Sequence, residues 1–135
     1  MKYRKVAIEL LDIWRKVSGT EVCRKMNSFV IGEYFVLNYL LNSEEIVYSK
    51  DISREMDVTT ARVAAILNQI EKKGWIERTQ DCDDNRQTIV SITEEGIKVI
   101  REKRREITDE VVTVLEKIGE KDAEELLRIQ RKIIE

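Results

Sequence analysis

The chain has 135 residues, of which 42% are hydrophobic and 37% charged, so it is long and apolar enough for one folded domain, and a disordered chain is excluded. Its 24 basic and 26 acidic residues give a formal net charge of -2, which neither indicates nor excludes DNA as a partner, because a nucleic-acid binder needs positive charge on one face only. No apolar run reaches the length of a membrane span and the N-terminus is charged throughout, so we expect a cytoplasmic protein without a signal peptide or membrane contact.

The first predicted element is an amphipathic helix over residues 3–25. Its apolar residues recur at helical spacing, which puts on one face Val6, Leu10, Ile13 and Val17. The weak helix formers at 18–20 mark a point of interruption. A break at 26–28, with Ser28 as N-cap, precedes a second helix over 30–41 that is apolar nearly all round, which predicts a buried central strut. Residues 47–48 predict a very short strand.

Two short helices joined by a tight turn follow. Ser49 is predicted to cap a helix over 50–56, residues 57–58 form the turn, and Thr59 caps a helix from Thr60 to about residue 73. Gly74 ends this second helix, because glycine adopts the left-handed conformation at little cost. Its core face is predicted to consist of Val63, Ile66, Leu67 and Ile70. This arrangement is the helix-turn-helix pattern.

Residues 75–80 and 87–92 have strand-like character, with side chains that alternate between two faces, and a polar loop at 81–86 joins them. This pattern predicts a β-hairpin wing. Thr93 then caps a long helix with a heptad seam that contains one charged residue, Arg104, among Ile97, Ile100, Ile107, Val111, Val114 and Ile118. Gly119 ends the long helix. A last helix over about 121–134 is predicted to bury Ala123, Leu126, Leu127, Ile133 and Ile134.

The predicted fold class is mainly α with a small β-hairpin wing, a winged helix-turn-helix with N- and C-terminal dimerisation helices. Residues 1–135 form a single domain. Within it, residues 28–96 are the predicted DNA-binding lobe, and residues 1–27 and 97–135 are the predicted helical dimerisation region. We therefore expect a homodimer.

The N-terminus of the second helix of the pair is predicted to read DNA, because recognition helices present their first residues to the major groove. Arg62 is the strongest candidate, since arginine bonds bidentately to guanine. The small side chains along the same exposed face let the backbone approach closely. The predicted DNA-binding set is Ser49, Lys50, Thr59, Thr60, Ala61, Arg62, Ala64, Ala65, Asn68, Asp84 and Arg86. The alternative is an ordinary solvated helix face.

The wing loop is acidic, with Asp81, Asp83 and Asp84 against a single Arg86. Carboxylates repel phosphates unless they orient cations. We expect Asp84 to hold Arg86 in an ion pair that presents the guanidinium to a narrow minor groove. The alternative is a plain acidic hairpin tip. From residue 50 to residue 86 seven basic residues face eight acidic ones, a net charge of -1, so the predicted DNA affinity is modest and salt-dependent.

The order of elements, the segment YSKDISREMDVTTARVAAILNQIEKKGWIER and the wing DDNRQTIVSITEEG resemble the MarR family of transcriptional regulators. The family's Asp-x-Arg motif corresponds to residues 84–86 of this chain, and its Leu-Thr-x-x-Gly helix start corresponds to residues 92–96. The resemblance implies a winged helix-turn-helix homodimer on a pseudo-palindromic operator in double-stranded DNA. We expect a ligand-responsive repressor, with an activator as the alternative. The resemblance also implies that Arg86 enters the minor groove, oriented by Asp84. The chain departs from the family at Cys82 and Asn85, where many members carry proline and a basic residue.

The resemblance also implies a small aromatic or phenolic effector bound between the dimer helices and the lobe. Trp14, Tyr34 and Tyr39 are the candidate pocket residues, together with Phe35. The alternative is that these aromatic residues belong to the core.

Two further functions remain as alternatives. A winged-helix module that binds protein and not DNA is favoured slightly by the even charge count. A thiol-based redox regulator would use Cys23 or Cys82, although a packing role for Cys23 is the commoner case. Without histidine or a CxxC spacing, the sequence predicts no metal site, no cofactor and no enzyme activity.

Overall fold

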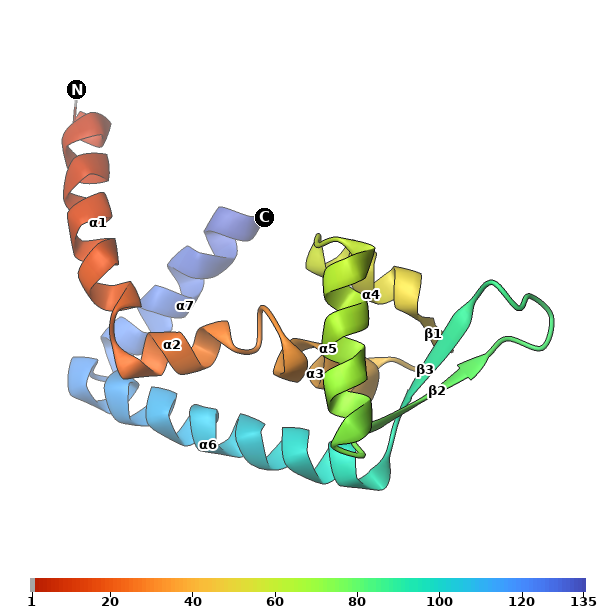
Figure 1. Ribbon diagram of the computed structural model, residues 1–135. Coiled ribbons are helices and arrows are strands. Elements are labelled where there is room, and N and C mark those ends of the chain that lie inside the picture. Colours follow the sequence, from red (N-terminus) through yellow and green to blue (C-terminus); the bar gives the residue numbers. More distant parts are fainter. Residues whose placement is uncertain (1) are drawn as a thin grey trace.

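The computed structural model describes residues 2–135 and contains, in this part of the chain, seven helices and a three-stranded sheet. The elements in order are α1 (Lys2–Ser18), α2 (Glu21–Asn27), α3 (Glu33–Asn42), β1 (Val47–Tyr48), α4 (Ser49–Met56), α5 (Thr60–Lys72), β2 (Ile76–Gln80), β3 (Thr88–Ile92), α6 (Glu94–Ile118) and α7 (Glu120–Ile134). A lobe from α3 to β3 lies at one end of the long helix α6, and α1, α2 and α7 gather at its other end (Figure 1). The predicted fold class is confirmed.

One apolar core holds the lobe together. It joins α3, α4, α5, the sheet and the first turns of α6, and its buried side chains include Leu37, Ile52, Leu67, Ile70, Ile76, Val90 and Ile100. The predicted inner face of α5 is buried throughout. Helix α5 buries one apolar stripe in this core and leaves its opposite face to solvent, whereas α3 is buried or partly buried on all sides up to residue 41, as expected for the predicted central strut.

The sheet is antiparallel with the order β1-β3-β2. Val47 of β1 and Arg78 of β2 both lie opposite Val90 of the central strand. The predicted short strand and the predicted wing hairpin are therefore confirmed, and together they attach the wing to the start of α4.

The N-terminal helices differ from the prediction. The region predicted as a helix over 3–25 is two helices, which break at 19–20, within the predicted point of interruption at 18–20; Thr20 caps α2 by accepting the backbone N–H of Cys23 at 3.4 Å. Ser28 follows the end of α2 and does not begin the next helix. Instead, Gly32, with φ of 85°, precedes α3 at Glu33, three residues later than predicted.

The caps within the lobe agree with the prediction except at one position. Thr59 accepts the backbone N–H of Arg62 at 3.2 Å, and Thr93 accepts that of Gly96 at 3.1 Å. Ser49 is the first residue of α4 and not its cap. The cap is Tyr48, whose backbone N–H donates to the carboxylate of Asp51 at 2.9 Å.

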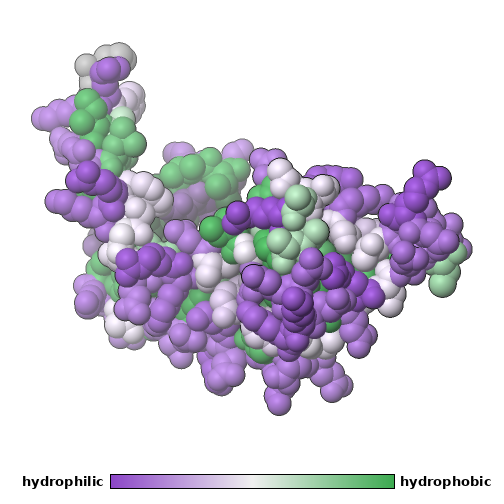
Figure 2. Space-filling view, in the orientation of Figure 1, coloured by the Kyte–Doolittle hydropathy of each residue, from purple (hydrophilic) through white to green (hydrophobic). Residues whose placement is uncertain are grey.

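The terminal helices expose their apolar faces in the single chain. No residue of α1 or α7 is buried, so the predicted burial of the α7 face is wrong within one protomer: Leu127 is 52% exposed and Ile133 73%. Hydrophobic side chains are visible along α1 and over α7 in the space-filling view (Figure 2). The heptad seam of α6 is only partly buried: Ile100 and Ile107 are buried, whereas Val114 and Ile118, further along the helix, are exposed. No helix within residues 2–135 combines the length and apolarity needed to cross a membrane.

The contact between Gly96 and the Trp75 backbone gives the first prediction. A Cβ at position 96 would lie 2.1 Å from the Trp75 carbonyl oxygen, so Gly96→Ala has to move backbone and should lower the free energy of unfolding by about 1–3 kcal/mol. Denaturation followed by circular dichroism at fixed protein concentration measures the loss. Gly19→Ala is the matched control, since its Cβ would meet nothing closer than 3.5 Å. Equal stability of both variants would contradict the packing described.

Candidate nucleic-acid interface

Helix α5 presents a continuous outer face made of small and polar side chains. Val63, Ile66, Leu67 and Ile70 fix the helix by burial in the core. The predicted contact residues on this helix are all exposed: Thr60, Ala61, Arg62, Ala64, Ala65 and Asn68. Burial of one stripe therefore determines which side chains a partner can meet, and it leaves Arg62 free at the first turn.

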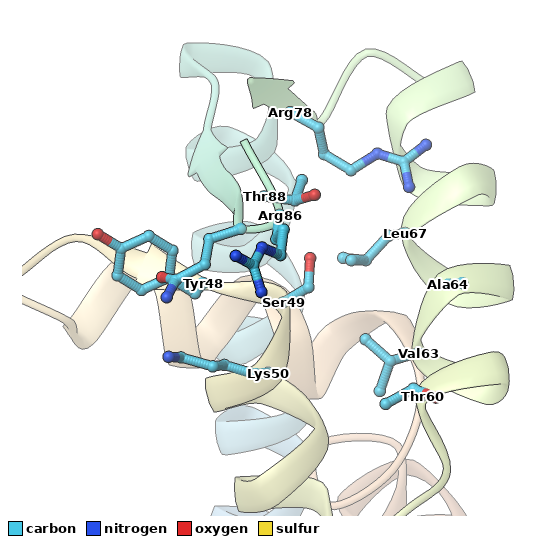
Figure 3. A pocket seen from close by; sticks show the side chains of 11 residues that line it. Tyr48, Ser49, Lys50, Thr60, Val63, Ala64, Leu67, Arg78, Arg86 and Thr88 are labelled. Atoms are coloured by element: carbon cyan, nitrogen blue, oxygen red, sulfur yellow. The ribbon is translucent and has the colours of Figure 1, made fainter. Parts of the chain in front are cut away.

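A groove of about 360 Å³ lies between α5, the start of α4 and the wing. Figure 3 shows Lys50 and Arg86 on the side of this groove opposite Thr60, Val63 and Ala64 of α5. Five of the predicted residues are thus brought together here: Ser49, Lys50, Thr60, Ala64 and Arg86. The predicted residues Thr59, Ala61, Arg62, Ala65, Asn68 and Asp84 do not line the groove itself. The groove combines three cations, Lys50, Arg78 and Arg86, with the close approach that small side chains allow.

Asp84 and Arg86 lie together at the wing tip, as the sequence suggested. The Asp84 carboxylate accepts the backbone N–H of Arg86 at 3.0 Å, and the Arg86 Nε lies 3.9 Å from the same oxygen. The Arg86 side chain is 95% exposed. Asp84 therefore orders the loop backbone more strongly than it holds the guanidinium, which stays free to reach outward.

Asp81 also acts within the wing. Its carboxylate accepts the phenol O–H of Tyr48 at 2.9 Å and the backbone N–H of Asp83 at 3.0 Å. The backbone N–H of Asp83, and then the Tyr48 hydroxyl, hold the pKa of Asp81 below its ordinary value, while the hydrogen bond to Asp81 raises the pKa of Tyr48. Tyr48 thereby connects the wing loop to the start of α4.

Arg78 is a residue of this site that the sequence reasoning missed. It donates from Nη2 and Nε to the Glu71 carboxylate at 2.9 and 3.3 Å, and from Nη2 to the Asn68 side-chain oxygen at 2.6 Å. These hydrogen bonds hold the pKa of Glu71 below its ordinary value. Alternation along the strand was the available signal, because Arg78 shares a face with the buried Ile76 and so points toward α5.

The predicted effector residues do not share a pocket in one protomer. Trp14 is 63% exposed on α1, which projects away from the lobe (Figure 1). Tyr39 stacks on Phe35, and Tyr34 stacks on Phe29 under Lys103. An apolar cavity of about 410 Å³ lies instead between α2, α3 and α6, lined by Met26, Phe29, Asn38, Arg104, Ile107, Thr108, Val111, Val112 and Leu115.

The cysteines lie in different surroundings. Cys23 is half-buried in α2, and Cys82 is exposed on the wing loop. Neither cysteine joins the groove.

Residues 20–103 match the family model described as transcriptional regulator SarA/Rot. Among curated proteins, the chain is 32% identical over 71 residues to the uncharacterised HTH-type transcriptional regulator YdgJ of Bacillus subtilis, a match that covers 53% of this chain and 43% of the relative. The matched segment spans about half the length of the first such relatives.

Solved structures share the fold over almost the whole chain. A MarR family protein from Bacillus stearothermophilus superposes with a TM-score of 0.77 at 21% identity, covering 98% of this chain and 95% of the other. Sco3205, a MarR family transcriptional regulator from Streptomyces coelicolor solved in complex with DNA, gives a TM-score of 0.72 at 17% identity, covering 99% and 86%. The resemblance predicted from the wing sequence is confirmed at the level of the fold.

The Glu71–Arg78 pair gives the second prediction. In Arg78→Met the pKa of Glu71 should rise to the ordinary glutamate range, because the donors that stabilise its charged form are gone. In the folded wild type the pKa of Glu71 lies below the ordinary glutamate value. The Glu71–Arg78 pair therefore stabilises the fold at pH values above the ordinary glutamate pKa range, and this contribution is lost as the pH falls. NMR titration of the side-chain carboxyl carbon measures the pKa of Glu71 in both proteins. Glu125, whose pKa is lowered by Arg128 on α7, is an internal control that should not move. A Glu71 pKa unchanged by the substitution would contradict the pairing.

Proposed function

The chain belongs to the SarA/Rot family of transcriptional regulators, and on that basis we propose that it binds double-stranded DNA as a homodimer on a pseudo-palindromic operator in the cytoplasm, as a ligand-responsive repressor. The observation that carries the proposal is the exposed face of α5 beside the cationic groove and the wing. The DNA complex solved for Sco3205, which shares the fold, supports the same mode of binding.

In the proposed complex α5 enters the major groove with its first turn. Arg62 donates to a guanine edge, while Thr60 and the alanines allow the helix backbone to approach. Arg86, at the exposed wing tip, reaches the adjacent minor groove, where a narrow groove concentrates negative potential. Lys50 contacts phosphate beside the start of α4 and fixes the register.

The even charge count slightly favoured the alternative of a protein-binding module, and from residue 50 to residue 86 there are eight acidic residues. Four of those carboxylates are engaged inside the protomer: Asp51, Glu71, Asp81 and Asp84. Their partners are backbone N–H groups, Tyr48 and Arg78, so these carboxylates do not offer a free acidic surface. Lys50, Arg54, Arg62 and Arg86 remain exposed, which supports DNA as the partner.

We propose a second copy of the chain as the partner of α1 and α7. These helices lie at the same end of the protomer (Figure 1). Both expose apolar side chains that a monomer seldom leaves in water. The exposed C-terminal part of the α6 seam, Val114 and Ile118, continues toward α7. A dimer joined there would set the separation of two α5 helices, which has to match half-sites about one DNA turn apart, ~34 Å.

The proposed effector site is the cavity between α2, α3 and α6. Its lining is mainly apolar, and Arg104 donates to the side-chain oxygen of Asn38 at 3.2 Å among the lining residues. A small aromatic carboxylate fits this chemistry, with the ring among the apolar side chains and the charge toward Arg104. A ligand that binds the dimer better at one distance between its two DNA-binding lobes than at another would change the affinity for DNA. If no aromatic carboxylate changes the affinity for the operator, this part of the proposal is wrong.

Loss of either proposed base-reading arginine should weaken operator binding. We expect Arg62→Ala and Arg86→Ala to bind an operator fragment, selected from random DNA, at least about tenfold more weakly, as each removes a charge-assisted contact from both half-sites. Arg86→Ala should also reduce the slope of affinity against salt concentration. Fluorescence anisotropy at several salt concentrations measures both effects.

Arg24→Ala is the matched control, since Arg24 is exposed on α2 away from the groove, and it should bind like the wild type. Wild-type affinity in both groove variants would show that the contact residues are wrongly assigned. A wild-type protein that selects no DNA at low salt would favour the protein-binding module.

Charges placed on the terminal helices should abolish the dimer. In the double variant Ile13→Asp and Leu127→Asp, two side chains that are 55% and 52% exposed in the protomer become charged, so a folded chain of 15.9 kDa should replace a species of twice that mass. Light scattering after size exclusion measures the mass. Ile46→Asp, at a side chain 63% exposed on the lobe, should leave the dimer intact. A double variant that remains dimeric would contradict this interface.

A further inference from the structure

Tyr48 lies where the sheet, the first turn of α4 and the wing meet. Its backbone is held on two sides: its N–H donates to the Asp51 carboxylate at 2.9 Å, and in the sheet it lies opposite Ile89 of the central strand. Figure 3 shows its ring on the side of the groove that carries Lys50 and Arg86, with the hydroxyl directed away from α5. The phenol therefore extends from a fixed point of the lobe.

The hydroxyl of Tyr48 reaches the wing loop across the central strand. Ile89 of β3 pairs with Tyr48 on one side and with Thr79 of β2 on the other, so β3 separates Tyr48 from β2. The hydroxyl donates to the carboxylate of Asp81, the residue that follows β2, at 2.9 Å. This hydrogen bond joins the loop to the start of α4 independently of the backbone pairing between the strands.

Asp81 extends this connection into the loop. Its other carboxylate oxygen accepts the backbone N–H of Asp83 at 3.0 Å, and its own N–H donates to the carbonyl of Gln87 at 3.0 Å, which closes the loop at its base. At the tip, Asp84 accepts the backbone N–H of Arg86. Hydrogen bonds therefore connect the start of α4 to the backbone on both sides of Arg86, whose side chain is 95% exposed.

We propose that Tyr48 is a positioning residue for the minor-groove contact: through Asp81 its hydroxyl holds the wing loop where Arg86 meets the DNA that α5 reads. The inference rests on the proposed function, since it requires Arg86 to enter the minor groove. A loop without this hydrogen bond has to be ordered when DNA binds, and the conformational entropy lost in that step lowers the affinity. Tyr48 acts through the loop and not by touching a base.

The ring of Tyr48 makes a separate contact, which allows a selective test. The Nζ of Lys50 lies 5.6 Å from the ring centroid, within the range of a cation–π contact. Phenylalanine keeps this ring and loses only the hydroxyl. Tyr48→Phe therefore removes the hydrogen bond to Asp81 and leaves the surroundings of Lys50 unchanged, so its effect reports on the wing.

The first measurement needs no DNA. Backbone amide NMR relaxation of the full-length protein gives the order parameters of loop residues 82–86. We expect these order parameters to fall in Tyr48→Phe, while those of β2 and α5 stay at the wild-type values. Tyr3→Phe, the same change at a side chain 81% exposed on α1, should leave the loop unaltered. Unchanged order parameters of the loop in Tyr48→Phe would overturn the inference, whether or not the protein binds DNA.

The second measurement is operator affinity in a double-mutant cycle. On an operator selected from random double-stranded DNA, Tyr48→Phe should bind about threefold to tenfold more weakly than the wild type. In the Arg86→Ala background the same substitution should cost no further affinity, because the contact that it positions is already gone. In the Lys50→Ala background its full effect should remain, since the hydroxyl does not act through Lys50.

Two affinity results would overturn the inference and leave the proposed function standing. One is wild-type affinity of Tyr48→Phe for the selected operator, and the other is an equal loss with and without Arg86, which would mark a general structural role. A wild type that selects no DNA at low salt would overturn the proposed function and, with it, the role of Tyr48 in the DNA contact, even if the loop measurement shows the expected change.

Discussion

The close approach of α6 to the backbone of Trp75 fixes how the lobe is joined to the rest of the protein. The backbone N–H of Thr93 donates to the Trp75 carbonyl at 3.0 Å, and its hydroxyl donates to the Gly74 carbonyl at 2.6 Å. Only a residue without Cβ fits at Gly96, three residues further on. The end of α5, the base of the wing and the start of α6 are therefore one rigid junction. Any rotation of α6 would therefore carry α5 and the wing with it.

On the side of the lobe that carries the groove, the placement of the charged residues matters more than their number. The acidic residues outnumber the basic ones from residue 50 to residue 86. Three of their carboxylates nevertheless accept hydrogen bonds within the protomer: Asp51 from the Tyr48 backbone N–H, Asp81 from the Tyr48 hydroxyl, and Glu71 from Arg78. Each of these carboxylates strengthens a local structure that shapes the groove. The exposed cations at Lys50, Arg62 and Arg86 are left to meet an anionic partner. A polyanion is the ligand that this division of charge favours.

Much of the fold could be predicted because local chemistry determines it. The caps at Thr59 and Thr93, the stop at Gly74 and the apolar face of α5 follow from residue type and spacing alone. The weak helix formers at 18–20 also marked the break after α1. The start of α3 at Glu33 depends on the positive φ of Gly32, which periodicity does not reveal. In the site, contacts between distant segments were missed. Arg78 meets Asn68 only because β2 folds back along α5, and Trp14 is separated from the other aromatic residues by the break at 19–20.

Hydroxyl-radical footprinting on a selected operator shows whether two copies place their α5 helices and wings on one face of duplex DNA. We expect two protected half-sites related by two-fold symmetry, with centres about one helical turn apart, ~10 base pairs, and minor-groove protection beside each where Arg86 lies. Protection of a single half-site, or protection without symmetry and lacking a minor-groove component, would contradict this expectation.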